Sequence, residues 1–190
     1  MVFIPSFFYT QKMAVILPYK NMLPKISDTA WIAPTAAVVG DVEVGEETGI
    51  WFGCTVRGDV NDVRIGKRTN IQDGTVIHVT RGVQGTYIGD EVTVGHSALL
   101  HACTLEDRSF VGMGSTILDE AVIETDGMLA AGSLLTGGKR IKSGELWSGS
   151  PAKFWRYLTP EEIAFFPVSA DNYAKHVHEY LDIMREQTKG

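Results

Sequence analysis

Three of the five histidines in this chain stand close together in the sequence. They are His78, His96 and His101, and all three lie between Ile65 and Thr104. An imidazole can act as a general base or bind a metal ion, and three imidazoles are a common ligand set for catalytic zinc. A lone histidine is more often structural, but three in one short segment favour a metal site. The two histidines of the C-terminal tail have no such neighbours and are interpreted as structural.

Composition restricts the partners that this chain can have. It has 190 residues, of which 44% are hydrophobic, and a formal net charge of −6. This length suits one globular domain with an appendage. The acidic balance argues against nucleic acid and anionic membranes, which select basic patches, and indicates a small-molecule ligand. Cys54 and Cys103 lack the spacing of a metal motif and are expected to be reduced, buried thiols of a cytoplasmic protein.

The chain divides into three parts. Residues 1–13 are apolar but have neither a basic region nor a cleavage pattern, so they are interpreted as an N-terminal extension outside the fold. Residues 14–150 are predicted to form the folded domain, and residues 151–190 a helical tail that packs on it. Within the tail, Thr159, Pro160 and Glu162 have the order of a helix start. An apolar stripe with helical spacing follows: Tyr173, Val177, Tyr180, Leu181 and Met184.

An aliphatic residue recurs at every sixth position over most of the span from Ile32 to Trp147. This period is neither that of a helix nor that of a simple strand. The next position is often glycine, and we expect these glycines to supply the backbone freedom of tight corners between short strands. The pattern resembles that of hexapeptide-repeat proteins, in which three hexads form one triangular turn. The predicted fold is therefore an all-β solenoid, a left-handed parallel β-helix, with a C-terminal α-helix.

Counting the hexads around three sides predicts three columns of inward-pointing residues. The first column carries Val38, Val56, Ile77, Leu100, Ile117 and Leu135. The second carries Val44, Ile65, Ile88, Leu105, Ile123 and Ile141. The third carries Ile32, Ile50, Ile71, Val94, Val111, Leu129 and Trp147.

The six-residue period is interrupted at three places, all beside the histidines. The interruptions follow Val56, Ile77 and Leu100. Extra residues are expected to leave a solenoid as surface loops, often on its binding face. The interruptions therefore indicate a site independently of the histidines.

The same count places the polar residues. Arg57, His78 and His101 follow the inward residue of the first side on three successive turns. His78 and His101 are thus one strand spacing apart and can share one metal ion. Asp73 and His96 lie on the third side, so His96 cannot join the pair within one chain. Three copies packed side by side, first side against third, would bring it there.

Several short motifs carry a more specific resemblance. They are R-G-D at 57–59, N-I-Q-D-G at 70–74, V-G-H-S-A-L-L-H-A-C-T at 94–104, S-P-A-K at 150–153 and S-A-D-N-Y at 169–173. Together with His78 they resemble the γ-class carbonic anhydrases and their bacterial relatives. The resemblance implies a homotrimer that binds zinc, with iron or cobalt as alternatives, at each subunit interface. It also implies the ligands His78 and His101 of one chain with His96 of the next, and a metal-bound hydroxide that converts CO2 reversibly to bicarbonate.

The resemblance implies roles for further residues. Gln72 would hydrogen-bond the metal-bound water, Asn70 would hold the polar network beside it, and Tyr173 would line the pocket. Ion pairs at the subunit interface are implied for three charged residues, Arg57, Asp59 and Asp73.

The chain departs from the archetypal archaeal member of that family in its proton acceptors. That member has a glutamate after its R-x-D motif and others in an acidic loop after its first histidine. Here Val60 follows Asp59, and the loop from His78 to Tyr87 contains no carboxylate. CO2 hydration is therefore expected to be weak and limited by proton transfer.

Two other functions stay open. Hexapeptide solenoids also host CoA-dependent acyltransferases, and some γ-type relatives cleave acyl-CoA thioesters. An acyltransferase normally uses a single histidine as its base, which argues against that alternative. The second alternative is a non-catalytic metal-binding trimer, whose metal would carry no exchangeable water.

Overall fold

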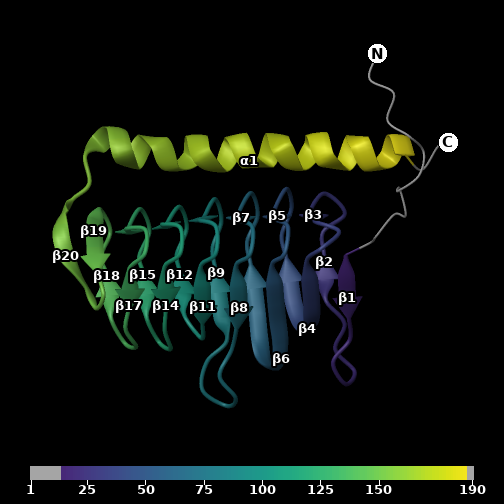
Figure 1. Cartoon of the computed structure of the whole chain (residues 1–190), viewed down its shortest axis with the longest axis horizontal. Helices are drawn as coiled ribbons and strands as arrows, with labels where there is room; N and C mark the ends of the chain where they lie inside the picture. Colours follow the sequence, from purple (N-terminus) through teal and green to yellow (C-terminus); the bar gives the residue numbers. More distant parts are fainter. Residues whose placement is uncertain (1–13, 188–190) are drawn as a thin grey trace.

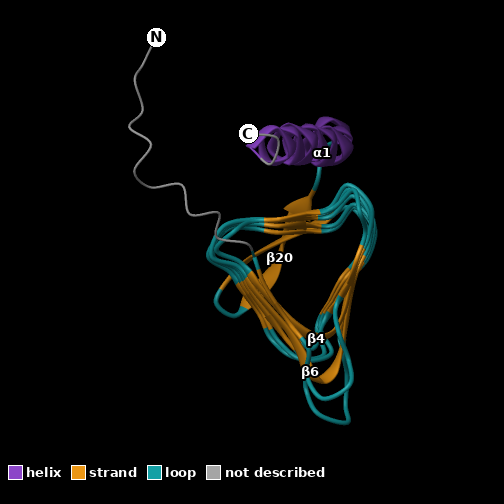
Figure 2. Cartoon of the chain, turned by 90° about the vertical axis from the view of Figure 1, so that its right-hand side faces the viewer, coloured by secondary structure: helices purple, strands orange, loops and turns teal. Residues whose placement is uncertain are grey.

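The chain winds into a triangular prism with one long helix lying along it (Figure 1). The computed structural model describes residues 14–187, and the predicted extension, residues 1–13, lies outside them. Figure 2 looks along the prism and shows three sides of short strands joined at corners, with the helix outside one side. All strand pairs of the prism are parallel except the last. The predicted β-helix of hexapeptide repeats is confirmed.

The strands form two sheets. The sheet nearest the helix contains, in spatial order, β20 (Ala152–Tyr157), β19 (Glu145–Gly149), β16 (Met128–Leu129), β13 (Phe110–Val111), β10 (Thr93–Val94), β7 (Asn70–Ile71), β5 (Gly49–Ile50) and β3 (Trp31–Ile32). The second sheet covers both other sides, because β4 (Ala37–Val44) and β6 (Thr55–Ile65) run from one side onto the next. Its first side is completed by β1 (Val15–Leu17), β8 (Val76–His78), β11 (Leu99–His101), β14 (Thr116–Ile117) and β17 (Leu134–Leu135). Its second side is completed by β2 (Lys25–Ile26), β9 (Thr86–Ile88), β12 (Thr104–Leu105), β15 (Val122–Ile123) and β18 (Arg140–Ile141).

The register of these strands confirms the three inward columns. Ile77, for example, lies opposite Val56 on one turn and Leu100 on the other. The inward residues are almost all fully buried, and only Ile32 and Trp147, at the ends of the third column, are partly exposed. The core is therefore a stack of aliphatic layers, one per turn, and it fixes how side chains of successive turns line up outside.

The glycines that follow the inward residues have a different role from the one expected. None of these five has a positive φ: Gly45, Gly66, Gly89, Gly95 and Gly112. Instead, a Cβ atom on Gly112 would lie 2.2 Å from the backbone nitrogen of Ala131 in the next turn. Positive φ angles occur at corner residues such as Glu47 and Arg68. The hexad glycines are required because stacked backbones approach closely, and the expectation of backbone freedom was wrong for them.

Gly112→Ala is therefore expected to lower the free energy of unfolding by about 1–3 kcal/mol, because the added methyl group forces stacked turns apart. Gly114→Asn is a matched control. Gly114 has a φ of 67°, which asparagine tolerates, and no atom lies within 4 Å of a Cβ placed there. Because a side chain at a positive φ is somewhat strained, the control is expected to cost up to about 1 kcal/mol, less than Gly112→Ala. Chemical denaturation measures both, and equal losses would contradict the close-approach explanation.

The three interruptions take three different forms. The first is no loop, contrary to expectation: β6 continues as a strand past the corner, carrying Asp59 and Asn61 along it. The second is a loop over residues 79–85, closed by a bridge between Thr80 and Gln84, and it hangs below the prism between β8 and β9 in Figure 1. The third is a tightened corner at Ala102, whose φ is 46°.

The tail begins with a strand, β20, that the sequence did not predict. This strand pairs antiparallel with β19. The helix α1 (Pro160–Gln187) then starts at the predicted capping box. The hydroxyl of Thr159 accepts from the backbone N–H of Glu162 at 3.3 Å, and the Glu162 carboxylate accepts from the backbone N–H of Thr159 at 2.9 Å. Hydrogen bonds from Arg156 and this N–H lower the pKa of Glu162 to about 2.

The predicted apolar stripe of α1 packs on the core, with Val177 fully buried. Polar contacts hold the helix to a corner of the prism: Arg68 forms an ion pair with Asp171 at 2.8 Å, and His178 forms a hydrogen bond with Glu47 at 2.8 Å. No helix among residues 14–187 combines the length and hydrophobicity needed to cross a bilayer.

Both cysteines are free thiols in the interior, as predicted. Burial raises the pKa of Cys54 to about 11 and that of Cys103 to about 12. They are inert structural groups at neutral pH.

Candidate metal centre

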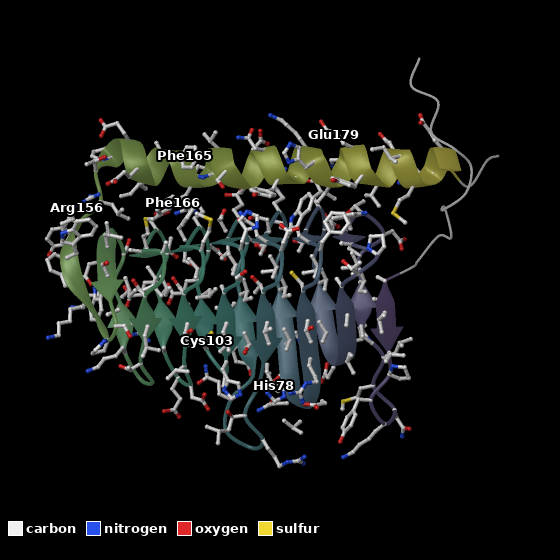
Figure 3. The ribbon with its side chains drawn as sticks, viewed as in Figure 1. His78, Cys103, Arg156, Phe165, Phe166 and Glu179 are labelled. Atoms are coloured by element: carbon white, nitrogen blue, oxygen red, sulfur yellow. The ribbon has the colours of Figure 1, made fainter. Side chains whose placement is uncertain are left out.

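His78 and His101 lie side by side at the edge of the prism that faces away from α1. Figure 3 shows His78 at this edge. The register of β8 and β11 places the two residues directly opposite each other, and Nδ1 of His78 is 3.2 Å from Nε2 of His101. We call these two residues the histidine pair.

A carboxylate holds the outer nitrogen of each imidazole. Nε2 of His78 is 3.1 Å from Oδ1 of Asp59, and Nδ1 of His101 is 2.6 Å from Oδ1 of Asp119. A carboxylate only accepts hydrogen bonds, so each outer nitrogen carries the proton. In neutral imidazoles, the two inner nitrogens then present lone pairs to each other.

This donor set fits a metal ion. Two lone pairs that face each other at 3.2 Å repel unless a positive charge lies between them. Two ligand atoms on a tetrahedral zinc ion with bonds of 2.0–2.1 Å are about 3.3 Å apart, close to the spacing seen here. Carboxylates on the outer nitrogens are also the usual support of metal-binding histidines. The histidine pair would hold zinc as two of its ligands.

His96 is not part of this arrangement. It follows β10 on the side of the prism nearest α1, and its Nδ1 lies 2.9 Å from Oδ2 of Asp73. Within residues 14–187 of a single chain, no three His, Cys, Asp or Glu side chains are grouped to hold a metal ion.

Gln72 and Asn70 lie on the same side of the prism as His96, and both are buried. The Gln72 amide donates to Oδ1 of Asn70 at 2.9 Å, and the Asn70 amide donates to the hydroxyl of Thr93 at 3.0 Å. That hydroxyl also lies 3.1 Å from Ser169 of α1. The helix thus helps to fix Asn70, and Asn70 fixes the orientation of Gln72.

Tyr173 projects from α1 onto this side. Its ring meets that of Trp51 edge to face at 5.5 Å. Burial and the nearby charge of Asp73 raise the pKa of Tyr173, which keeps its hydroxyl protonated at neutral pH. The structure thus sorts the predicted residues into two groups within one chain. One group surrounds the histidine pair, and the other, which we call the His96 group, contains Asn70, Gln72, Asp73, His96 and Tyr173.

Arg57 forms its ion pair inside the chain, at 2.5 Å from Asp59. Burial alone would raise the pKa of Asp59, but hydrogen bonds from Arg57 and His78 outweigh it and lower that pKa. Asp59 therefore stays ionised while it holds His78.

Sequence reasoning missed Asp119 and Thr80. Asp119 accepts hydrogen bonds from both His101 and the hydroxyl of Thr80. Only a weak signal was present, because Asp119 is the second residue after Ile117, the inward residue of the first side on the turn beyond His101. Counting one more turn places Leu118 at the position of His101 and the carboxylate of Asp119 one residue further. Thr80 lies in the loop 79–85, where the count gives no position.

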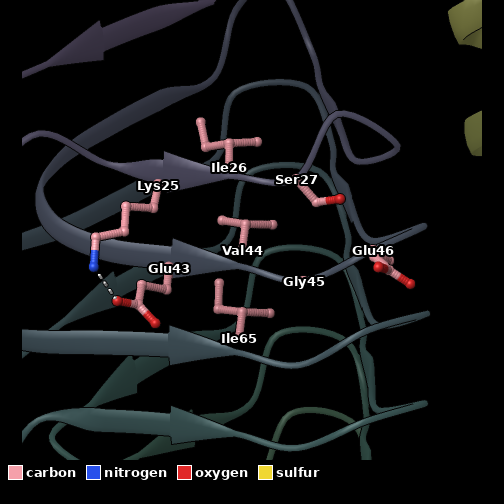
Figure 4. Close-up of a pocket in the computed structure, with 8 residues that line it drawn as sticks. All are labelled: Lys25, Ile26, Ser27, Glu43, Val44, Gly45, Glu46 and Ile65. Atoms are coloured by element: carbon pink, nitrogen blue, oxygen red, sulfur yellow. Dashed lines mark hydrogen bonds and ion pairs between the residues drawn. The ribbon is translucent and has the colours of Figure 1, made fainter.

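Two surface hollows help to locate the site. One of about 270 Å³ adjoins Asp59 and is also lined by Asn61 and Arg81, so it opens beside the histidine pair. Another, of about 470 Å³, is lined by Lys25, Glu43 and the aliphatic residues Ile26, Val44 and Ile65 (Figure 4). Lys25 and Glu43 pair with each other there at 2.9 Å, and neither of the two hollows is lined by a histidine. Of the two hollows, the first adjoins Asp59, which contacts His78.

Comparison with curated proteins finds close relatives, although no family model matches the chain. Gamma carbonic anhydrase 1 of Arabidopsis thaliana, named as mitochondrial, is 53% identical over 80% of this chain and 57% of its own length. The protein YrdA of Escherichia coli is 46% identical over 88% of this chain and 95% of its own. A carbonic anhydrase of Geobacillus kaustophilus is 39% identical over 92% of this chain and 95% of its own. The chain thus spans little more than half the length of the Arabidopsis relative and almost the whole length of the bacterial ones.

Solved structures show the same fold. A hexapeptide transferase family protein from Anaplasma phagocytophilum is 51% identical with a TM-score of 0.84, over 87% of this chain and 98% of its own. A structure from Bacillus cereus described as a putative acetyltransferase is 40% identical with a TM-score of 0.88, over 90% of this chain and 99% of its own.

Proposed function

Since this chain belongs to the γ-class carbonic anhydrase family, we propose that it is a carbonic anhydrase-like lyase that interconverts CO2 and bicarbonate at a metal centre between the subunits of a homotrimer. The observation that carries the proposal is the histidine pair. Its inner nitrogens face each other at 3.2 Å, and each imidazole is oriented by its own carboxylate. Zinc is the metal that suits this donor set, with iron or cobalt as alternatives.

Exposed apolar residues support the trimer. Val76 and Leu99, beside the histidine pair, have exposed fractions of 40% and 39%, and Phe52 and Met113, in the same outward column as His96, have 36% and 58%. Packing the first side of one copy against the His96 side of the next would cover both apolar strips. The contact is heterologous, and three copies can close it into a ring. It would bring His96 of the partner subunit to the histidine pair as the third ligand.

Several residues of this chain would then have separate roles around the metal ion and its water. When bound, the metal ion would supply a water whose pKa is low enough for it to act as a nucleophile near neutral pH, as is established for carbonic anhydrase. Gln72 donates an amide N–H to Asn70, so its side-chain carbonyl oxygen would be available to accept a hydrogen bond from that water. Tyr173, whose hydroxyl stays protonated, would line the pocket and offer CO2 a hydrogen-bond donor. Asp73 would keep His96 oriented through the contact that it already makes.

One protein sample tests the proposal against its alternatives. Metal analysis of anaerobically purified protein is expected to find about one metal ion for each chain, as three histidine ligands at each of three interfaces require. CO2 hydration by the same sample should be measurable in concentrated buffer and lost on chelation. Acyl-CoA hydrolysis without any hydration would support a thioesterase or acyltransferase-like enzyme instead. A full complement of metal with neither activity would support a non-catalytic trimer. Cytoplasmic location stays a prediction.

A further inference from the structure

The two carboxylates of the histidine pair differ in how their charge is balanced. Asp59 pairs with Arg57 as well as with His78. Asp119, among the ion pairs of residues 14–187, has His101 alone. Its second oxygen accepts instead from the neutral hydroxyl of Thr80. Both oxygens of Asp119 are therefore engaged, one by the imidazole and one by the loop 79–85.

Thr80 is itself held from two directions. Its backbone carbonyl accepts from the Asn61 amide at 3.2 Å, and its backbone N–H donates to the carbonyl of Gln84 at 3.1 Å. Asn61 lies in the first interruption of the hexad period and Thr80 in the second. The interruptions that surround the histidines thus supply the groups that brace them.

We propose that Asp119 and Thr80 are positioning residues for His101, and that the loop 79–85 departs from the hexad period in order to place Thr80 against Asp119. The inference rests on the proposed metal centre. Asp119 fixes the proton of His101 on Nδ1, so that Nε2 is free to bind metal. It also stops the imidazole ring from rotating about the Cβ–Cγ bond. Thr80 stops the carboxylate from turning in its place. Neither residue touches the metal or the substrate.

The structural reason for this need is exposure. Within one chain, the side chain of His101 keeps 30% of its surface accessible, so the core packing of that chain does not fix the ring. Water at the site could take the proton of Nδ1 or let the ring turn over. A metal-binding histidine that loses its orienting partner typically loses about 10- to 100-fold in metal affinity.

Zinc affinity measured by competition with a chelator tests the proposal on the full-length protein. Asp119→Ala is expected to weaken zinc binding about 10- to 100-fold, and Thr80→Val by a smaller factor. Asp119→Asn should stay close to wild type, because its amide oxygen still accepts from His101. Thr80→Ser should likewise restore the affinity lost in Thr80→Val. The absorption spectrum of the cobalt-loaded protein should change in Asp119→Ala and stay unchanged in Asp119→Asn.

Glu120→Gln is the matched control, since it removes one negative charge from the adjacent, exposed residue, whose side chain forms no hydrogen bond or ion pair among residues 14–187. Wild-type affinity and cobalt spectrum in Asp119→Ala would overturn the proposal. So would an Asp119→Asn protein as impaired as Asp119→Ala, which would show that charge matters and the hydrogen bond does not. If Asp119→Ala chains do not assemble, the comparison of Thr80→Val with Thr80→Ser decides. Zinc binding without CO2 hydration in the wild type would overturn the proposed function, while the affinity comparison would still decide this inference.

Discussion

Mixed trimers of His96→Ala and His78→Ala chains are expected to regain metal and CO2 hydration that neither variant has alone. Within one chain, His96 lies apart from the histidine pair and contacts Asp73 instead. Each complete site would therefore combine the pair of one chain with His96 of the partner subunit. In a random equal mixture of exchanging chains, every mixed trimer has one intact site of three, so about a quarter of all sites should recover. Zinc content and hydration rate after mixing measure this recovery.

A mixture of His78→Ala with His101→Ala chains is the control. Both residues belong to the same half of the site, so every pair in such a mixture lacks one ligand and no site should recover. Subunit exchange must be shown in both mixtures by native mass spectrometry. Full zinc binding by His96→Ala alone, or recovery in the control mixture, would refute the shared site.

Hydration by the wild-type protein is expected to increase about tenfold or more when imidazole is added to dilute buffer, since general acid–base groups contribute at least that much to proton transfer. The nucleophile is regenerated only when a proton leaves the site. Val60, at the position that follows Asp59, packs partly buried against the core, and the exposed residues of the loop include Arg81 and Val83 but no acid. Asp59 and Asp119 already hold the imidazoles. Proton transfer to buffer should therefore limit the rate.

Val83→Glu is expected to raise hydration in dilute buffer and to weaken its dependence on imidazole. Val83 has an exposed fraction of 60% and lies three positions after Thr80, so a carboxylate there can accept a proton without disturbing the core. Val83→Gln has the same shape without a titratable group and should behave like the wild type. Fast hydration by the wild type at any buffer concentration would show that another group carries the proton.

The hexad period was enough to predict which residues line up along each side of the prism. In a hexad solenoid the neighbour on the next turn is reached by counting, because each turn repeats the same three strands and the inward residues set the register. Counting therefore predicted that His78 and His101 are neighbours and that His96 lies on another side, and it predicted the apolar stripe of α1 from its helical spacing. The motifs added the family.

Contacts of residues in the interruptions could be seen only in the folded chain. Residues in the interruptions have no place in the hexad register, so only the folded loop shows that Thr80 meets Asp119. Rotamers and hydrogen-bond partners depend on the space around each side chain. The sequence could therefore not predict that Nδ1 of His78 and Nε2 of His101 face each other, because Asp59 and Asp119 set the orientation of the two rings. The role of Gly112 depends likewise on how closely two backbones stack, a distance set by the strand spacing of the whole prism. Local sequence encodes register here, whereas contacts between turns and loops are properties of the assembled solenoid.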